Sequence, residues 1–240
     1  MAERPPLPGA IGVSHLRVYD TEAPDGLAGG TPHLHTLCTE AYSVVAGRGR
    51  VQTLTAAGFE EVPLEPGALV WFTPGTIHRL VNDGDLEINV VMQNAGLPEA
   101  GDMVITLPSD VVADDDAYRA AATLPPEEAT TAGSGDAARL RRDAGVRGFT
   151  ALRDAAAAGD LGPLLAFHRA ARRIVAPHLD RFAEVWRAGP ARVAAETGEL
   201  LEAMRDGSVD HLRAASVHRL PPPGPERRMG CCGTLGTYLP

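Results

Sequence analysis

Three histidines and one glutamate in the first third of the chain have the types and spacing of metal ligands. His33 and His35 stand at positions i and i+2 in the stretch PHLHTLCTE. On a β-strand such residues point to the same face, about 6.6 Å apart along the chain. Both imidazoles can therefore reach one metal ion, at about 2.0–2.1 Å through a ring nitrogen. Glu40 adds an oxygen ligand, and His78 must come from a distant strand.

The donor set indicates a site for chemistry. Three imidazoles and one carboxylate suit a divalent first-row metal and leave coordination positions free for a substrate. Open positions distinguish a catalytic metal site from a closed structural one. We therefore expect one divalent ion, and the residues do not distinguish among Fe, Mn, Zn and Ni.

Short runs of strand character position these ligands. Between about residues 10 and 110, Gly, Pro, Asn and Asp interrupt apolar runs every 8–12 residues or so, as in Gly47-Arg48-Gly49 and Asn82-Asp83-Gly84-Asp85. This spacing predicts an all-β sandwich or barrel. The predicted strands cover residues 11–19, 33–38, 41–47, 50–55, 68–73, 78–82, 86–93 and 102–107.

The character of the chain changes after Pro108. Acidic residues at 114–116 precede a helical run, as a helix N-terminus favours. Residues 136–216 are rich in Ala, Leu and Arg at helical spacing, with breaks that predict about four helices. The expected organisation is a β-barrel metal-binding domain (1–110), a linker with a short helix (111–135), a helical extension (136–219) and an irregular Pro/Gly/Cys tail (220–240).

The candidate ligands stand within a longer pattern. The first histidine pair is followed by four residues, the glutamate, six residues and Gly47, and His78 lies among turn residues in GALVWFTPGTIHRLVN (67–82). This combination resembles the two motifs of the cupin superfamily, G(X)5HXH(X)3–4E(X)6G and G(X)5PXG(X)2H(X)3N. The leading glycine of the first motif is displaced, and Thr73 replaces a proline of the second. Both departures affect turns and not ligands.

The resemblance covers about 100 of the 240 residues. It implies a cupin jelly-roll barrel of antiparallel strands over about residues 10–110, with a metal near one end of its interior, followed by an α-helical region, so that the whole chain is α+β. It slightly favours a dioxygenase, in which Fe(II) binds substrate and O₂. The alternatives are Lewis-acid chemistry in a sugar isomerase, lyase or decarboxylase, and a metabolite-binding or sensing protein without catalysis.

Strand alternation adds Tyr42 to the candidate site. If Glu40 faces the barrel interior, Tyr42 and Val44 do so too, because side chains alternate between the faces of a strand. Tyr42 is then a proton donor or a support for the metal ligands, and an interior packing role is equally compatible. On the strand at 86–93 the set Leu86, Ile88, Val90 and Met92 is expected to face inward.

The three cysteines do not form a disulfide framework. Cys38 lies between two candidate ligands and fits a small buried hydrophobic residue better than a reactive thiol. Cys231-Cys232 has three interpretations: a soft-metal site, a redox switch or close packing of small residues, of which we favour the last.

Charge and composition limit the partners. The net charge of −9 argues against nucleic acid and anionic membranes, and all 22 basic residues are Arg, which excludes Schiff-base chemistry and a Walker lysine. His168, Arg169, Arg172 and Arg173 form a solvated face or, if they cover the barrel mouth, an anion clamp. A small-molecule substrate and a cytoplasmic location are expected. An open jelly-roll edge favours a homodimer unless the helical region covers that edge.

Overall fold

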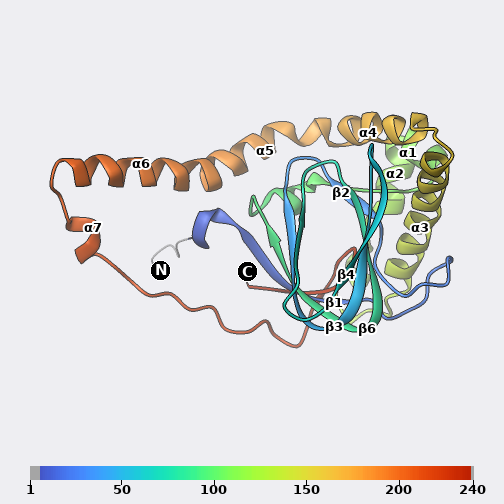
Figure 1. The fold of residues 1–240 in the computed structure, drawn as a ribbon, viewed down its shortest axis with the longest axis horizontal. Coiled ribbons are helices and arrows are strands. Elements are labelled where there is room, and N and C mark those ends of the chain that lie inside the picture. Colours follow the sequence, from blue (N-terminus) through green and yellow to red (C-terminus); the bar gives the residue numbers. More distant parts are fainter. Residues whose placement is uncertain (1–5, 239–240) are drawn as a thin grey trace.

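The computed structural model describes residues 6–238, and the outermost residues of the predicted barrel domain and tail (1–5, 239–240) lie outside the described part (Figure 1). The strands are β1 Gly12–Val18, β2 His33–His35, β3 Glu40–Thr55, β4 Gly58–Leu64, β5 Leu69–Phe72, β6 Ile77–Met92, β7 Met103–Ile105, β8 Arg228–Met229 and β9 Gly233–Thr237. The helices are α1 Ser109–Ala113, α2 Asp115–Ala122, α3 Asp136–Ala157, α4 Gly162–Val175, α5 Leu179–Trp186, α6 Arg192–Arg205 and α7 Asp210–Arg213.

Two long antiparallel strands, β3 and β6, form the centre of the barrel (Figure 1). The sequence predicts each as two short strands separated by a turn, and this is wrong: both runs of turn residues lie inside continuous strands. They form bulges instead, with register shifts between Val44 and Gly49. Gly47 has a φ of 73°, and a Cβ there would lie 2.0 Å from the Asp85 carbonyl oxygen, so only glycine permits this bend.

The other strands extend this pair into a curved antiparallel sheet in the order β4-β3-β6-β1-β9-β8, with β5 on β3 and β2 between β6 and β7. The barrel interior is apolar and includes Leu16, Val51, Leu80 and Ile88. The expected jelly-roll barrel, with an α+β chain overall, is confirmed. The sequence does not predict β4. This exposed edge strand pairs with β3 alone and carries glutamates in place of an apolar face, so it lacks the pattern of a buried strand.

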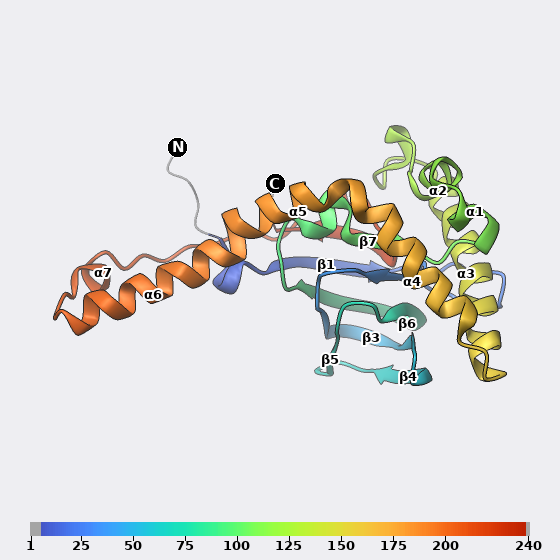
Figure 2. The same cartoon turned by 90° about the horizontal axis from the view of Figure 1, so that it is seen from above.

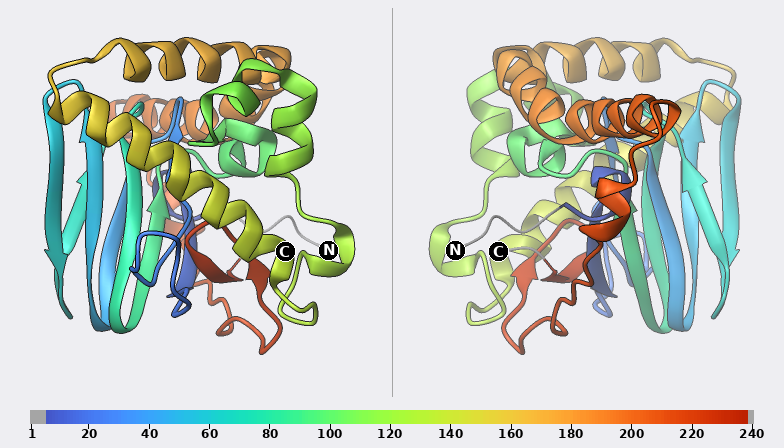
Figure 3. Two further views of the ribbon diagram at one scale, coloured as in Figure 1. Left: turned by 90° about the vertical axis from the view of Figure 1, so that its right-hand side faces the viewer. Right: turned by 90° about the vertical axis from the view of Figure 1, so that its left-hand side faces the viewer.

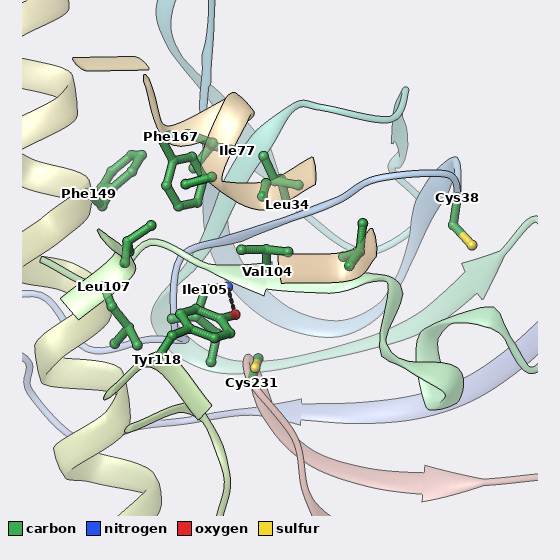
Figure 4. Close-up of a cluster of buried hydrophobic side chains, with 14 of the residues drawn as sticks. Leu34, Cys38, Ile77, Val104, Ile105, Leu107, Tyr118, Phe149, Phe167 and Cys231 are labelled. Carbon is green, nitrogen blue, oxygen red and sulfur yellow. Dashed lines mark hydrogen bonds between the residues drawn. The ribbon is translucent and has the colours of Figure 1, made fainter. Parts of the chain in front are cut away.

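Helix α3 crosses one side of the barrel, α4 lies over one end of it, and α1 and α2 lie beside these two helices (Figure 1 and Figure 3). Their apolar faces share a core with β2 and β7, in which Phe149 and Phe167 meet Leu34 and Val104 (Figure 4). Because the helical region and the barrel are joined by this common core, the helices hold one wall of the barrel in place.

The end of the chain returns to the barrel. Beyond α5 the helix α6 extends away from the barrel and has no buried residue (Figure 2). The chain then runs back, and β9 pairs with β1 from Ser14↔Thr237 to Val18↔Gly233. The predicted domain boundaries at 110, 135 and 219 stay a prediction. Among the described helices, none combines the length and hydropathy that crossing a membrane requires.

Candidate metal centre

The structure brings the four candidate ligands together. His33 and His35 come from β2, Glu40 begins β3 and His78 lies near the start of β6. Each offers a donor atom, and these atoms lie within 4.8 Å of one another. All four side chains are buried. The strand register explains this convergence, because His33 and His78 are direct partners across β2 and β6.

The donor atoms face a common centre. His78 Nε2 lies 3.1 Å from His33 Nε2 and 3.1 Å from Glu40 Oε2. His35 Nε2 lies 3.3 Å from the same carboxylate oxygen. Adjacent ligands bound at roughly 2.1 Å and at right angles to each other are about 3 Å apart, so these separations suit ligands of one ion.

Backbone carbonyls orient two of the imidazoles. His33 Nδ1 donates to the Thr31 carbonyl at 2.8 Å, and His78 Nδ1 donates to the Thr76 carbonyl at 3.1 Å. Because a carbonyl can only accept a hydrogen bond, each Nδ1 carries the proton and each Nε2 presents its lone pair to the centre. Such partners on the far ring nitrogen are typical of metal-binding histidines.

Asp102 orients the third imidazole, and sequence reasoning missed it. Its carboxylate lies 3.3 Å from His35 Nδ1 and accepts hydrogen bonds from the backbone amides of Thr36, Leu37 and Cys38. These amides form the turn between β2 and β3, which the odd step from His35 to Glu40 requires. Burial alone would raise the pKa of Asp102, but the hydrogen bonds from His35 and Thr36 lower it to about 2. Asp102 therefore shapes the turn and holds His35 as a charged acceptor.

The cluster contains acidic and basic groups whose ionisation is strongly coupled. Burial would raise the pKa of Glu40, but His78 and His35 hold it well below its usual range. Burial and the neighbouring imidazoles lower the pKa of His33. For His35, burial is outweighed by the carboxylates of Asp102 and Glu40, which raise the pKa to about 9. Two anionic carboxylates therefore meet one imidazole that favours its charged form, His35, and one that favours its neutral form, His33.

The residues fit a metal ion. Glu40 Oε2 is buried and makes no hydrogen bond of normal geometry with any described group, although two imidazole nitrogens lie close to it. An anionic oxygen without such partners is costly to bury. A divalent cation among three nitrogens and this oxygen removes that cost, and the donor types are those that first-row metals prefer.

A cavity of about 460 Å³ opens beside the cluster, with His33, His35 and Glu40 on its wall. Val90 and Met92 of β6 line it, as strand alternation predicts. The rest of the wall includes segments that the sequence did not connect to the site: Arg141 of α3 and residues 228–232 of the returning C-terminal segment. The helical region and the end of the chain thus complete the cavity that the barrel begins.

Tyr42 lies behind the cluster. Its ring packs against Phe72 and His78, with centroids 5.3 and 6.3 Å away. Its hydroxyl is buried near the Glu40 carboxylate and the Cys232 thiol, without a hydrogen-bond partner among the described residues. Burial raises the pKa of Tyr42 well above its usual value. Tyr42 is absent from the residues that line the cavity, a position that fits support of Glu40 better than contact with substrate.

The other sequence candidates lie in different surroundings. All three cysteines are free and buried, and Cys231 and Cys232 stand on the cavity wall. His168 and Arg172 line a second hollow between the barrel and α4 that contains none of the four candidate ligands, and Arg173 pairs with Asp115.

The segment of the chain that holds this cluster matches a known family. Residues 21–92, which hold all four candidate ligands, match the cupin domain model. The chain contains a cupin domain. The four donors on β2, β3 and β6 are thus part of the cupin segment, whereas Asp102, Arg141 and the C-terminal segment lie outside it.

Solved structures show limited likeness to the chain. The uridine complex of Streptomyces PAC13 is 19% identical over 34% of this chain and 57% of that one, with a TM-score of 0.27. A cupin protein from Bacteroides fragilis is 18% identical over 36% and 65%, also with a TM-score of 0.27. A structure of the DMSP lyases RdDddP and RnDddQII is 25% identical over 37% and 40%, with a TM-score of 0.28.

The chain thus spans less than two thirds of each of these proteins. A search of the curated proteins gives no match.

Proposed function

We propose that this protein binds one divalent metal ion through His33, His35, Glu40 and His78 and is an enzyme that acts on a small polar metabolite. The observation that supports this is the convergence of four buried donors on the wall of a cavity. A structural site would be enclosed, whereas this one adjoins a space of about 460 Å³, within the range of small-molecule sites.

A bound divalent ion supplies Lewis acidity and, if it is iron, O₂ chemistry. The protein residues have separate tasks. The carbonyls of Thr31 and Thr76 keep two Nε2 lone pairs directed inward. Asp102 fixes His35. Apolar side chains of β6 exclude water from part of the cavity, which strengthens electrostatic interactions with a bound substrate.

We slightly favour dioxygenase chemistry, because the resemblance of the motifs to the cupin superfamily favours it. The donor set itself would leave coordination positions on a divalent ion free for substrate, whichever first-row metal is bound. The isomerase, lyase or decarboxylase alternative uses the same residues with Zn, Mn or Ni. The non-catalytic sensing alternative uses them for binding only. Each alternative corresponds to a different outcome of one experiment.

The experiment measures the metal content of protein purified without added metal, and then its turnover of a metabolite pool. Stoichiometric iron with substrate-dependent O₂ uptake supports the dioxygenase. Bound Zn, Mn or Ni with anaerobic turnover supports the second alternative. A full equivalent of metal without turnover favours a sensor. Protein that binds no first-row metal, even when metal is supplied, contradicts the whole proposal.

The proposed partners and location go with this function. We propose a small-molecule substrate, no nucleic-acid partner and a cytoplasmic site of action. The net charge of −9 supports the absence of a nucleic-acid partner, and three free cysteines fit a reducing compartment. A homodimer stays a prediction that sedimentation of the purified protein tests.

A further inference from the structure

Arg141 carries a positive charge into the cavity wall without a carboxylate to balance it. It lies on α3, outside the cupin segment, and lines the cavity together with His33, His35 and Glu40. Its guanidinium donates to two backbone carbonyls, at 3.2 Å to Ala122 and 2.9 Å to Gly230. The carbonyls fix its position, so the charge is held at the cavity.

The arginines on either side of Arg141 in α3 differ from it in this respect. Arg139 pairs with Asp136, and Arg142 pairs with Asp143. Among the described residues no acidic group lies within ion-pair distance of Arg141, and its buried Nε has no hydrogen-bond partner. The groups around it are neutral: Tyr19, Tyr118 and Cys231. The two carbonyls replace only part of the hydration that this half-buried guanidinium loses, and no counter-ion among the described residues balances its charge.

The remaining wall limits the ligand that this charge would serve. Apolar side chains from β1, β6 and β9 provide much of it, including Leu16, Met92 and Leu235. Besides the imidazoles of the cluster, the charged side chains are two glutamates, Glu40 and Glu99, and two arginines, Arg141 and Arg228. These charges balance, so a divalent ion at the four-residue cluster would make the cavity positive in a protein whose net charge is −9.

We propose that Arg141 binds the anionic group of the ligand of this cavity, and that the ligand is an oxyanion, a carboxylate or a phosphate, on a short apolar body. That this ligand lies beside a metal ion rests on the proposed function. A guanidinium has five N–H donors, of which two are committed to the carbonyls and one, on Nε, is buried. The two that remain, one on each terminal nitrogen, suit the paired oxygens of such a group. Arg141 is then a specificity-determining residue that the helical region supplies to the barrel.

The test compares three probes of one length: hexanoate, hexyl phosphate and hexan-1-ol. Ligand-observed NMR titration gives the affinity of each probe for the protein as purified, after its metal content has been determined. The variants are Arg141→Gln, which keeps an amide donor for the Gly230 carbonyl, Arg141→Lys, which keeps the charge, and Arg139→Gln as the control on the same helix.

We expect an anion to bind the wild type at least tenfold more tightly than hexan-1-ol, and Arg141→Gln to lose that preference. Arg141→Lys should retain part of it and Arg139→Gln all of it. The tighter anion identifies the headgroup. Unchanged affinity for hexan-1-ol in Arg141→Gln shows that the cavity is intact. If that variant loses the alcohol as well, thermal melting and the Arg141→Lys variant decide whether charge or folding is responsible.

Two results overturn the inference. The first is equal binding of the anions and the alcohol by the wild type, including no binding of either. The second is an anion preference that persists in Arg141→Gln, which would place the anion on the metal or on Arg228. Both results are obtained from probe binding, whereas the proposed function is tested by the metal content of the protein. A protein without metal whose anion preference depends on Arg141 would contradict the proposed function and leave the role of Arg141 intact.

Discussion

The two sides of the cavity are built in different ways. On one side the four candidate ligands lie on β2, β3 and β6, whose pairing register places them within 4.8 Å of one another. On the other side Arg141 and Cys231-Cys232 come from α3 and the returning C-terminal segment. The pairing register of the strands fixes the positions of their side chains strictly, as metal ligation requires. Segments that only cover the barrel are not held by that register. If both proposals hold, reaction chemistry and ligand choice are carried by separate parts of the chain.

The two sides are nevertheless linked through one residue. Thr31 donates its amide to the Cys231 carbonyl at 2.8 Å and accepts from His33 Nδ1 through its own carbonyl. The backbone of the C-terminal segment therefore supports the loop that orients a candidate ligand. The variants below test how far the two sides are independent.

The largest effect is expected from the barrel side. His78→Ala removes a fully buried candidate ligand from the cluster, so stoichiometric metal binding should be lost, together with any metal-dependent turnover. Elemental analysis after dialysis measures this. His218→Ala, which changes an exposed histidine, is the control and should keep a full equivalent. Retention of a full equivalent by both His78→Ala and His33→Ala would contradict the ligand assignment.

A smaller effect on the same side is expected from Asp102→Asn. The amide keeps the shape of the side chain but removes the charge that holds His35 and accepts from the turn amides. Loss of such an outer partner typically lowers metal affinity by about 10–100-fold. Competition with a chelator measures the affinity, and Asp110→Asn, an exposed acid nearby, is the control. Equal affinities in the two variants would show that His35 needs no carboxylate partner.

The contrast between the two sides also explains what could be predicted from the sequence. The ligands were predictable because two stand at i and i+2 on one strand and all four fit a motif spacing. Asp102 could not be found in this way, since it meets Thr36 across 66 residues and no local periodicity marks it. Arg141 meets Gly230 across 89 residues, and its signal is only the lack of an acidic partner, which appears once the helices are in place. Contacts between residues so far apart in the sequence depend on how the folded elements pack, and no periodic pattern in a single sequence marks them.

The C-terminal side can be disturbed without changing a candidate ligand. At Gly233 an added Cβ would lie 2.0 Å from the Arg17 carbonyl oxygen, so Gly233→Ala should force β9 away from β1. Overpacking of this kind costs about 1–3 kcal/mol. Thermal melting and thiol labelling should show lower stability and faster reaction of Cys231 and Cys232.

Metal stoichiometry should remain one in Gly233→Ala, because β2, β3 and β6 keep their register. Gly198→Ala is the control, since its Cβ meets no atom within 4 Å. Loss of the metal in Gly233→Ala, with the barrel still folded, would mean that the C-terminal segment is part of the metal centre.

The smallest effect is expected from Tyr42→Phe. The change removes a buried hydroxyl that has no partner among the described residues and leaves the ring against Phe72 and His78. Because an unsatisfied buried polar group destabilises the fold, its removal should be neutral or stabilising by up to about 1 kcal/mol. Metal affinity should change less than tenfold, since the hydroxyl is near Glu40 but is not a candidate ligand.

Turnover separates the two roles that the sequence leaves open for Tyr42. A residue behind Glu40 that does not line the cavity changes turnover only through the metal, so the rate per bound metal should be close to that of the wild type. General acid–base groups contribute typically 10²–10⁴-fold. A loss of that size at full metal occupancy would make Tyr42 a proton donor and would show that the cavity extends behind Glu40 when substrate binds.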